Sequence, residues 1–437
     1  MTDLMTSDRS HAIFERGRDM VPAGTHSNSR VAQPHPRYFQ RAAGAELWDV
    51  DGNRWLDFVM GNAAVVLGHG DPDVSAAVRA ALDDGLGAGV ESELSIAAAE
   101  KFLELVDAAE QVRFTNTGTE AAMHAVHVAR VVTGRPAIAK IEGAYHGWWD
   151  EVFVSTWPDL ARAGQPLRPS SLAGGPGLDP DAVGRAVVIP FNDLEAARSL
   201  LTEHRDRIAA LFVEPTMIDV GFIPPQAGYL QGLRAITDDL GIVLVFDELL
   251  TGFRIAVGGA QAKYGVNADL SMWGKGLANG VPIAALAGMR TFMERTGPGP
   301  ENAPFVGTFN GYRPALAACL ATLEKLQDGS IVAGLNRRSA ELSDAFASLA
   351  QGFGVPAKLH SGGGHFQPYF TDSDVIDYRS AATTNAERYH VWSTTLTEQG
   401  LMVVPKALLH GAFSAAHGDR HFEAFIEATR EAFSRMA

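Results

Sequence analysis

The sequence contains a single cysteine among 437 residues and no long run of apolar residues. A lone Cys319 excludes an intrachain disulfide and a cysteine-rich zinc site, and no H-E-x-x-H motif is present, so we expect no metal site. No stretch reaches the ~18 apolar residues that span a bilayer. The N-terminal segment 1–17 is polar and lacks an apolar core, so we expect neither a signal peptide nor a membrane partner.

Basic residues are also scarce, because 36 Lys and Arg face 51 Asp and Glu and leave a net charge of −15. An acidic surface repels phosphate backbones and anionic lipid, which predicts that the protein has no nucleic-acid partner. A small anionic ligand is still possible, since a few cations can dominate inside a pocket. The composition is that of a globular protein, and we expect a cytoplasmic enzyme.

The order of predicted elements indicates an α/β protein. Segment 46–59 reads as a hairpin with its tight turn at Asp51-Gly52. Beyond residue 60, helical patterns at 73–85 and 118–134 alternate with β-rich runs at 137–143, 209–215, 241–248 and 284–289. Such alternation predicts a mostly parallel sheet covered on both faces. From about 321 onward the pattern fits a smaller α+β domain, against which the first 60 residues are expected to pack.

The segment 157–184 has several Gly and Pro and little periodicity, which predicts a long loop. Its composition fits equally well an active-site lid and a passive surface excursion. Trp148 and Trp149, just before it, either form an apolar wall for an aromatic substrate or pack the lid.

Three motifs follow predicted strands, where open α/β sheets bind ligands. Thr117-Gly118-Thr119 begins a predicted helix and is either a phosphate cup or an ordinary helix cap. Asp247 ends an apolar strand, where a carboxylate needs a cationic partner: a protonated heterocyclic nitrogen or a structural salt bridge. Lys275 lies between Gly274 and Gly276 and is either a nucleophile or a solvated lysine in a turn.

Taken in order, the motifs TNTGTEA, EGAYHG, VEP, FDELLTGFR, GGAQAKYGVNADL, WGKG and GTFNG resemble those of class III aminotransferases of PLP fold type I. The resemblance covers most of the chain, from about Val21 to the final helix, and is greatest to the branch of glutamate-1-semialdehyde aminomutases and β-amino-acid aminotransferases. It implies a large PLP-binding domain at 61–320 and a small domain built from 1–60 and 321–437. The mobile lid of that branch coincides with the loop after Gly147.

The resemblance also implies roles for individual residues. Lys275 would hold pyridoxal 5'-phosphate covalently and move the proton, and Asp247 would pair with the pyridinium nitrogen. The phosphate would be bound by Thr117, Gly118 and Thr119, and by Thr308 from the neighbouring subunit of a homodimer. Tyr145 would stack on the cofactor ring with His146 beside it.

The resemblance also points to residues for substrate binding, and the sequence differs from the aminomutase pattern at two positions. By resemblance Arg30 would bind a substrate carboxylate with its guanidinium fork, and Lys406 would offer a second cation or is a surface charge. Asp219 stands near the cofactor hydroxyl where the aminomutases carry asparagine, and Leu409 stands where they carry glutamate. Both departures favour an aminotransferase over an aminomutase.

We therefore predict a PLP-dependent aminotransferase that moves an amino group from an amino acid or amine donor to a 2-oxo acid acceptor in two half-reactions. The alternative with the same cofactor is an aminomutase or a racemase. A nicotinamide-dependent oxidoreductase is disfavoured because the GLGAG at 85–89 follows a helical stretch and lacks the third glycine of a dinucleotide motif. A catalytically silent PLP-fold protein is disfavoured because Lys275 and Asp247 are retained.

Overall fold

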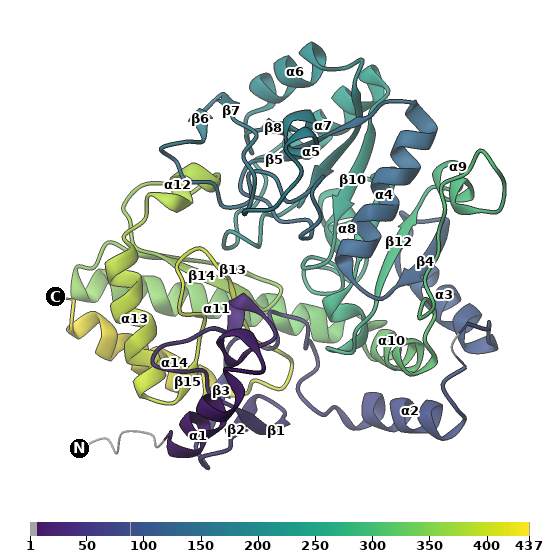
Figure 1. The fold of residues 1–437 in the computed structure, drawn as a ribbon. Helices are drawn as coiled ribbons and strands as arrows, with labels where there is room; N and C mark the ends of the chain where they lie inside the picture. Colours follow the sequence, from purple (N-terminus) through teal and green to yellow (C-terminus); the bar gives the residue numbers. More distant parts are fainter. Residues whose placement is uncertain (1–6, 88, 437) are drawn as a thin grey trace.

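The computed structural model describes residues 7–87 and 89–436 (Figure 1). The first six residues of the polar N-terminal segment and Ala88 of the GLGAG motif lie outside the described residues. At the centre is a seven-stranded sheet, in the order β4 (Gln111–Thr115), β12 (Ala284–Gly288), β11 (Leu270–Trp273), β10 (Val243–Asp247), β9 (Ile208–Val213), β5 (Ala137–Ile141) and β8 (Val187–Ile189). The predicted mostly parallel α/β sheet is confirmed.

The strand β12 is the exception, since it runs antiparallel to both β11 and β4. The connection from β11 to β12 explains this orientation. It contains only the short 3-10 turn Lys275–Ala278 and a few further residues, whereas a parallel return needs a crossover of a dozen or more.

Helices cover both faces of the sheet, as the apolar run of each central strand requires. In β10, Val243 and Val245 pack with α4 (Gly118–Thr133). The alternate residues Leu244 and Phe246 point to the other face and pack with α6 (Leu194–Glu203) and α7 (Tyr229–Leu240). The sheet is therefore buried on both sides, and its strand ends are the edge that remains for ligands.

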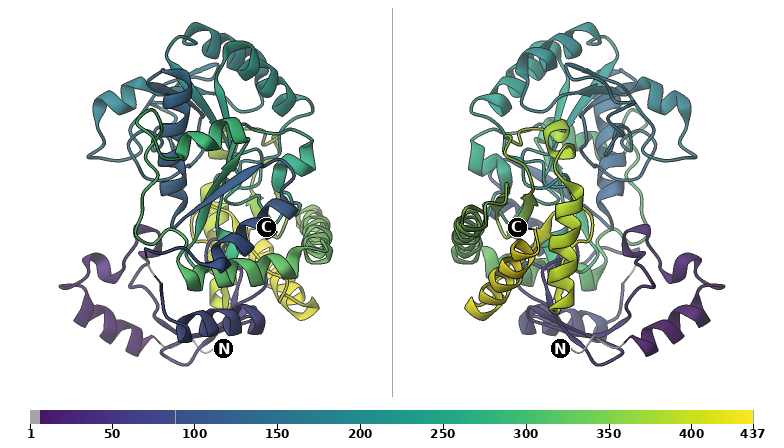
Figure 2. Two further views of the ribbon diagram at one scale, coloured as in Figure 1. Left: turned by 90° about the vertical axis from the view of Figure 1, so that its right-hand side faces the viewer. Right: turned by 90° about the vertical axis from the view of Figure 1, so that its left-hand side faces the viewer.

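The N-terminal and C-terminal parts share a second sheet. The predicted hairpin is present as β2 (Glu46–Asp49) and β3 (Arg54–Asp57), preceded by β1 (Phe39–Ala43). The late strand β15 (Leu401–Met402) pairs in parallel with β3, so residues about 340 positions apart are neighbours in this sheet. In both views of Figure 2 the first segment, with α1 (Asp8–Gly17), stands out from the rest of the fold.

The C-terminal part contains a three-stranded sheet of β13 (Lys358–Gly362), β14 (His365–Tyr369) and β16 (Gly411–Ala412). Its helices are α11 (Ser330–Phe353), α12 (Tyr378–Ala382), α13 (Ala386–Glu398) and α14 (Asp419–Ser434). The division at 60/61 and 320/321 stays a prediction, and its second boundary falls within α10 (Arg313–Leu326). The remaining helices are α2 (Pro72–Asp83), α3 (Glu93–Leu105), α5 (Pro180–Arg185), α8 (Gly259–Tyr264) and α9 (Arg290–Met293).

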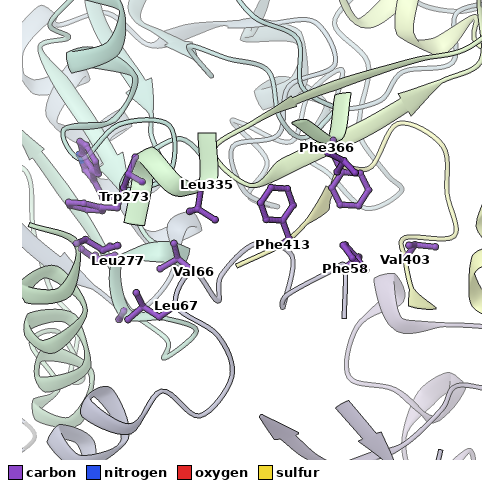
Figure 3. Packing of buried hydrophobic residues seen from close by; sticks show 14 of the residues in the cluster. Phe58, Val66, Leu67, Trp273, Leu277, Leu335, Phe366, Val403 and Phe413 are labelled. Atoms are coloured by element: carbon purple, nitrogen blue, oxygen red, sulfur yellow. The ribbon is translucent and has the colours of Figure 1, made fainter. Parts of the chain in front are cut away.

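One hydrophobic cluster joins these parts (Figure 3). It contains Trp273 of the large sheet, Phe58 of the N-terminal part, and Phe366 and Phe413 of the C-terminal part. Beside it, the buried Arg254 donates hydrogen bonds to four backbone carbonyls, those of Ala63 and Val65 and, in the C-terminal part, those of Gly363 and Phe413. Burial lowers the pKa of Arg254 to about 9. Because the hydrophobic cluster and the Arg254 hydrogen bonds both connect different parts of the chain, these parts are not independent units.

The segment 157–184 is mostly irregular, as predicted, but it holds two short elements that the sequence reading missed. A small hairpin of β6 (Gly164–Gln165) and β7 (Arg168–Pro169) lies in its middle, and α5 begins near its end. The start of α5 carries a clear signal, because Asp179 caps it and Pro180 occupies its first position. Among the described residues, none of the helices is long and apolar enough to span a membrane.

Candidate active site

A cavity of about 290 Å³ opens at the carboxyl ends of the central strands. Its walls come from the segments that follow β4, β5, β9, β10 and β11, the edge where open α/β sheets bind ligands. Eight of the predicted site residues line it together: Thr117, Gly118, Thr119, Tyr145, His146, Asp219, Asp247 and Lys275.

The start of α4 shows the helix cap that is one of the two interpretations of the TGT motif. Thr117 is the helix N-cap, and its hydroxyl and the Glu120 carboxylate form a reciprocal capping box. The amides of Gly118 and Thr119 lie in the first turn, where a helix offers them no carbonyl partner. Because the motif lines the cavity, these amides and the positive end of the helix are available to an anion, and the phosphate cup stays a prediction.

Asp247 is held by two donors at the end of β10. The Nδ1 atom of His146 lies 2.8 Å from Oδ2 of Asp247, and the amide of Leu249 donates to Oδ1 at 3.1 Å. A carboxylate only accepts, so Nδ1 of His146 carries the proton. Burial lowers the pKa of His146, which keeps the imidazole neutral.

This arrangement fits a cationic ring nitrogen in the cavity. Among the described residues, the two hydrogen-bond donors to Asp247 are uncharged, and a buried carboxylate is unfavourable without a cation. A protonated pyridine nitrogen supplies that cation. The amides of Gly118 and Thr119, which also line the cavity, suit a phosphate, so the residues present fit pyridoxal phosphate.

Lys275 follows β11 and begins the 3-10 turn with a left-handed backbone, φ +46°. Of its flanking glycines, Gly274 is closely packed, since a Cβ there would lie 3.2 Å from Cδ2 of Leu249, whereas a Cβ on Gly276 would meet only ordinary contacts at 3.6 Å or beyond. A non-glycine residue with positive φ is uncommon and is typical of functional sites. Lys275 therefore presents its ammonium group to the cavity from a constrained backbone.

Glu214, which the sequence reading quoted in VEP without a role, is a third carboxylate in the cavity. It is buried and accepts hydrogen bonds from the amides of Tyr145, Ile218 and Asp219 at 3.0–3.3 Å. Burial, followed by the charges of Asp219 and Asp247, raises the pKa of Glu214 well above its usual range. Its position directly after a buried strand, like that of Asp247, was the available signal.

Asp219 lines the same cavity and is influenced by the charges of Asp247 and Lys275. Burial raises the pKa of Asp219 to about 6, the Lys275 charge opposes the rise, and the Asp247 charge adds to it. Tyr145 responds to the same environment: burial and the charges of Asp219 and Asp247 raise the pKa of its phenol to about 12. The tyrosine is therefore a neutral hydroxyl at physiological pH.

Gly147 is a position that must be glycine for the site to form, which the sequence did not indicate. Its backbone has φ +114°, and a Cβ there would lie 2.8 Å from Oγ1 of Thr119. Only glycine lets the segment after Tyr145 and His146 pass this close to the start of α4.

Five other residues named in the sequence reading are not brought into the cavity. Arg30, Lys406 and Thr308 are exposed and are absent from its described lining. Trp148 and Trp149 do not line it either. Trp148 is 73% exposed, and Trp149 packs against the hydrophobic cluster beneath α4, so the predicted apolar wall is not formed by this pair.

Comparison with known proteins gives consistent matches over nearly the whole chain. The sequence model of the family described as aminotransferase class-III matches residues 27–405. A glutamate-1-semialdehyde 2,1-aminomutase from Desulfitobacterium hafniense is 36% identical over 98% of both chains. An omega-transaminase from Sphaerobacter thermophilus superposes with a TM-score of 0.92 at 35% identity over 97% of both chains. A transaminase solved with PLP bound has a TM-score of 0.89 at 28% identity, over 99% of this chain and 98% of that one.

Proposed function

The chain belongs to the class III aminotransferase family of PLP-dependent enzymes, and we propose that it transfers an amino group from an amine or amino acid to a 2-oxo acid in two half-reactions. The observation that carries the proposal is the common cavity of Lys275, the His146–Asp247 pair and the first turn of α4. Nucleophile, countercharge and anion site are the three groups that this chemistry needs from the protein.

Each group has a distinct task. Pyridoxal phosphate, when bound, supplies the electron sink for the carbanion formed at the donor carbon. Lys275 would bind the cofactor, take the proton from that carbon as a general base, and donate it again as a general acid. Asp247, oriented by neutral His146, would keep the ring nitrogen protonated. The amides of Gly118 and Thr119 would anchor the phosphate, and Tyr145 would cover the ring face.

The test compares Lys275→Ala with Lys358→Ala, a lysine of β13 that bonds to the carbonyl of Ser373. Wild type and the Lys358 variant should bind pyridoxal phosphate with visible absorbance that changes on adding an amine donor, and should consume an added 2-oxo acid. Lys275→Ala should lose both the absorbance of the covalently held cofactor and turnover. Normal turnover by Lys275→Ala would contradict the assignment.

A second candidate is an intramolecular aminomutase, because the relative from Desulfitobacterium hafniense carries that name at 36% identity. Leu409, where the resemblance expects glutamate, favours the aminotransferase. The two reactions, and a racemase, differ in their need for an acceptor. Isomerised or racemised product formed with no 2-oxo acid present would establish the alternative, whereas product that appears only with the acceptor supports transamination.

We also propose that the enzyme is a homodimer in which Thr308 reaches the partner's phosphate. Val306 and Phe309, on either side of Thr308, are 78% and 57% exposed, which is unusual for large apolar side chains that remain in water. The same segment approaches the start of α4, since Asn310 accepts a hydrogen bond from Asn116 at 3.2 Å. A two-fold interface would cover these side chains and place each segment near the other subunit's site.

Light scattering should then give twice the mass of one chain. Thr308→Ala should weaken cofactor binding about tenfold, the effect of losing one hydrogen bond to a charged group. The control Thr383→Ala alters an exposed threonine of the C-terminal part and should leave affinity unchanged. A monomer, or unchanged affinity in the Thr308 variant, would exclude this role.

Arg30 and Lys406 stay predictions for binding a substrate carboxylate, as does the cytoplasmic location. If Arg30 binds the carboxylate, Arg30→Ala should raise KM for an amino acid donor. It should leave KM unchanged for an amine donor that has no carboxylate. Equal effects on both donors would remove Arg30 from the substrate site.

A further inference from the structure

Trp157 stands at the rim of the cavity and touches two of the residues that line it. Its indole lies parallel to the ring of Tyr145, with centroids 5.8 Å apart and planes within 4°. Its Nε1 donates a hydrogen bond to the backbone carbonyl of Asp219 at 3.2 Å. The residue is nevertheless 39% exposed, so part of it remains accessible to a ligand.

The backbone of Trp157 is strained, with φ +47°, and Ser155 two positions earlier has φ +45°. A bulky aromatic residue in the left-handed region is a genuine outlier, and it persists only where its surroundings hold it. The neighbouring segments do so here. Ser155 exchanges backbone hydrogen bonds with Leu172 and Gly143, and the buried Thr156 donates to the carbonyl of Ala144 at 3.1 Å.

The charges around the cavity restrict what can approach Trp157. Among the described lining residues, the acidic side chains are Glu214, Asp219 and Asp247, while Lys275 is the one lysine or arginine. A second negative charge on the distal part of a substrate would be repelled on this side. A flat uncharged ring would instead gain offset stacking on the open part of the indole.

Resting on the proposed aminotransferase function, we propose that Trp157 is a specificity-determining residue that selects amine donors whose distal group is an uncharged aromatic ring. The reacting carbon must reach Lys275 inside the cavity, and its larger substituent extends over the rim. The stack on Tyr145 and the hydrogen bond to Asp219 fix the indole, so little freedom is lost when a ring packs against it.

The test uses 1-phenylethylamine and 1-cyclohexylethylamine, two donors of similar size and equal charge, with the PLP-loaded enzyme. Trp157→Leu should lower the ratio of kcat/KM for phenyl over cyclohexyl by about three- to tenfold, the range expected for a lost aromatic pair. Trp157→Phe keeps an aromatic face and should retain most of the ratio. The matched control is Trp148→Leu, which removes the 73% exposed tryptophan nine positions earlier and should leave the ratio unchanged.

A binding readout that needs no turnover separates this inference from the proposed function. The unreactive 1-phenylethanol should quench the tryptophan fluorescence of wild type and of Trp148→Leu, and the quenching should be absent in Trp157→Phe. If wild type converts neither amine with a 2-oxo acid, the proposed function fails, while the alcohol titration still tests Trp157. An unchanged ratio in a Trp157→Leu variant that holds its cofactor, or quenching retained in Trp157→Phe, would overturn the proposal.

Discussion

Asp219→Asn is the substitution that most directly tests the electrostatics of the site. It keeps the shape of the side chain and removes one of three carboxylates that share the cavity with Lys275. Burial raises the pKa of Asp219 from 3.8 to about 6 despite the attraction of Lys275. The ionised aspartate is therefore a net cost to the folded protein near neutral pH, and the neutral amide should remove that cost.

The magnitude follows from the shift in pKa. A rise of about two units corresponds to about 3 kcal/mol at 1.36 kcal/mol per unit. Because Asp219 is only partly buried, solvent screening reduces this to about 1–2 kcal/mol. With an unfolding entropy of about 0.9 kcal/mol/K for a chain of this length, Asp219→Asn should raise Tm by about 1–2 °C at pH 8.

The sign depends on pH in a defined way. Between pH 4 and 6 the folded state binds more protons at Asp219 than the unfolded state does, so wild-type stability falls as pH rises through this window. The advantage of Asp219→Asn should be complete above pH 6, about half as large near pH 5, and absent below pH 4.

Differential scanning calorimetry of the PLP-loaded protein at pH 5, 6, 7 and 8 measures the effect. Asp206→Asn is the matched control, since the Asp206 side chain is 95% exposed and its removal should give no pH-dependent difference. An Asp219→Asn protein that is less stable than wild type at pH 8, or an advantage that does not change with pH, would refute the reasoning.

Three further changes test other parts of the structure. Asp247→Asn should lower kcat by about 10²–10³-fold while the protein still binds pyridoxal phosphate; nearly unchanged kcat in steady-state assays would contradict its role. Arg254→Met leaves four buried carbonyls without their donor and should lower the free energy of unfolding by about 4 kcal/mol or more, seen as a Tm about 4 °C lower; a Tm within 1 °C of wild type would argue against it. Arg379→Ala breaks the paired hydrogen bonds to Glu142 and those to the carbonyls of Ala163 and Gly164, so trypsin should cleave after the exposed Arg162 faster, and an unchanged cleavage rate would show that this contact does not hold the loop.

The central sheet and the cavity could be predicted because their signals are local. Apolar runs such as Val243–Phe246 predict buried strands, and Asp247 directly after such a run predicts a residue at the ligand edge. Since parallel strand ends meet at one edge, the order of the motifs was enough to bring Thr119, Asp247 and Lys275 together.

The features that were missed depend on contacts between distant segments. Glu214 accepts a hydrogen bond from the amide of Tyr145, 69 residues earlier in the chain, and this contact forms only in the fold. Trp157 looked like part of an irregular loop, because neither its positive φ nor its stack on Tyr145 leaves a mark on the sequence. Arg254 belongs to a recognised motif, yet its function in joining the large sheet to the C-terminal part depends on carbonyls of Gly363 and Phe413 more than 100 residues away.

The pairing of β3 with β15 has a consequence for how the protein is made. Residues 54–57 leave the ribosome about 340 residues before their partner strand at 401–402. At about 5–20 residues per second, the edge of this early hairpin waits roughly 20–70 s for its neighbour. During that interval its free backbone groups can pair with other chains. Slower translation of the last third of the chain should therefore increase aggregation more than an equal delay before residue 50.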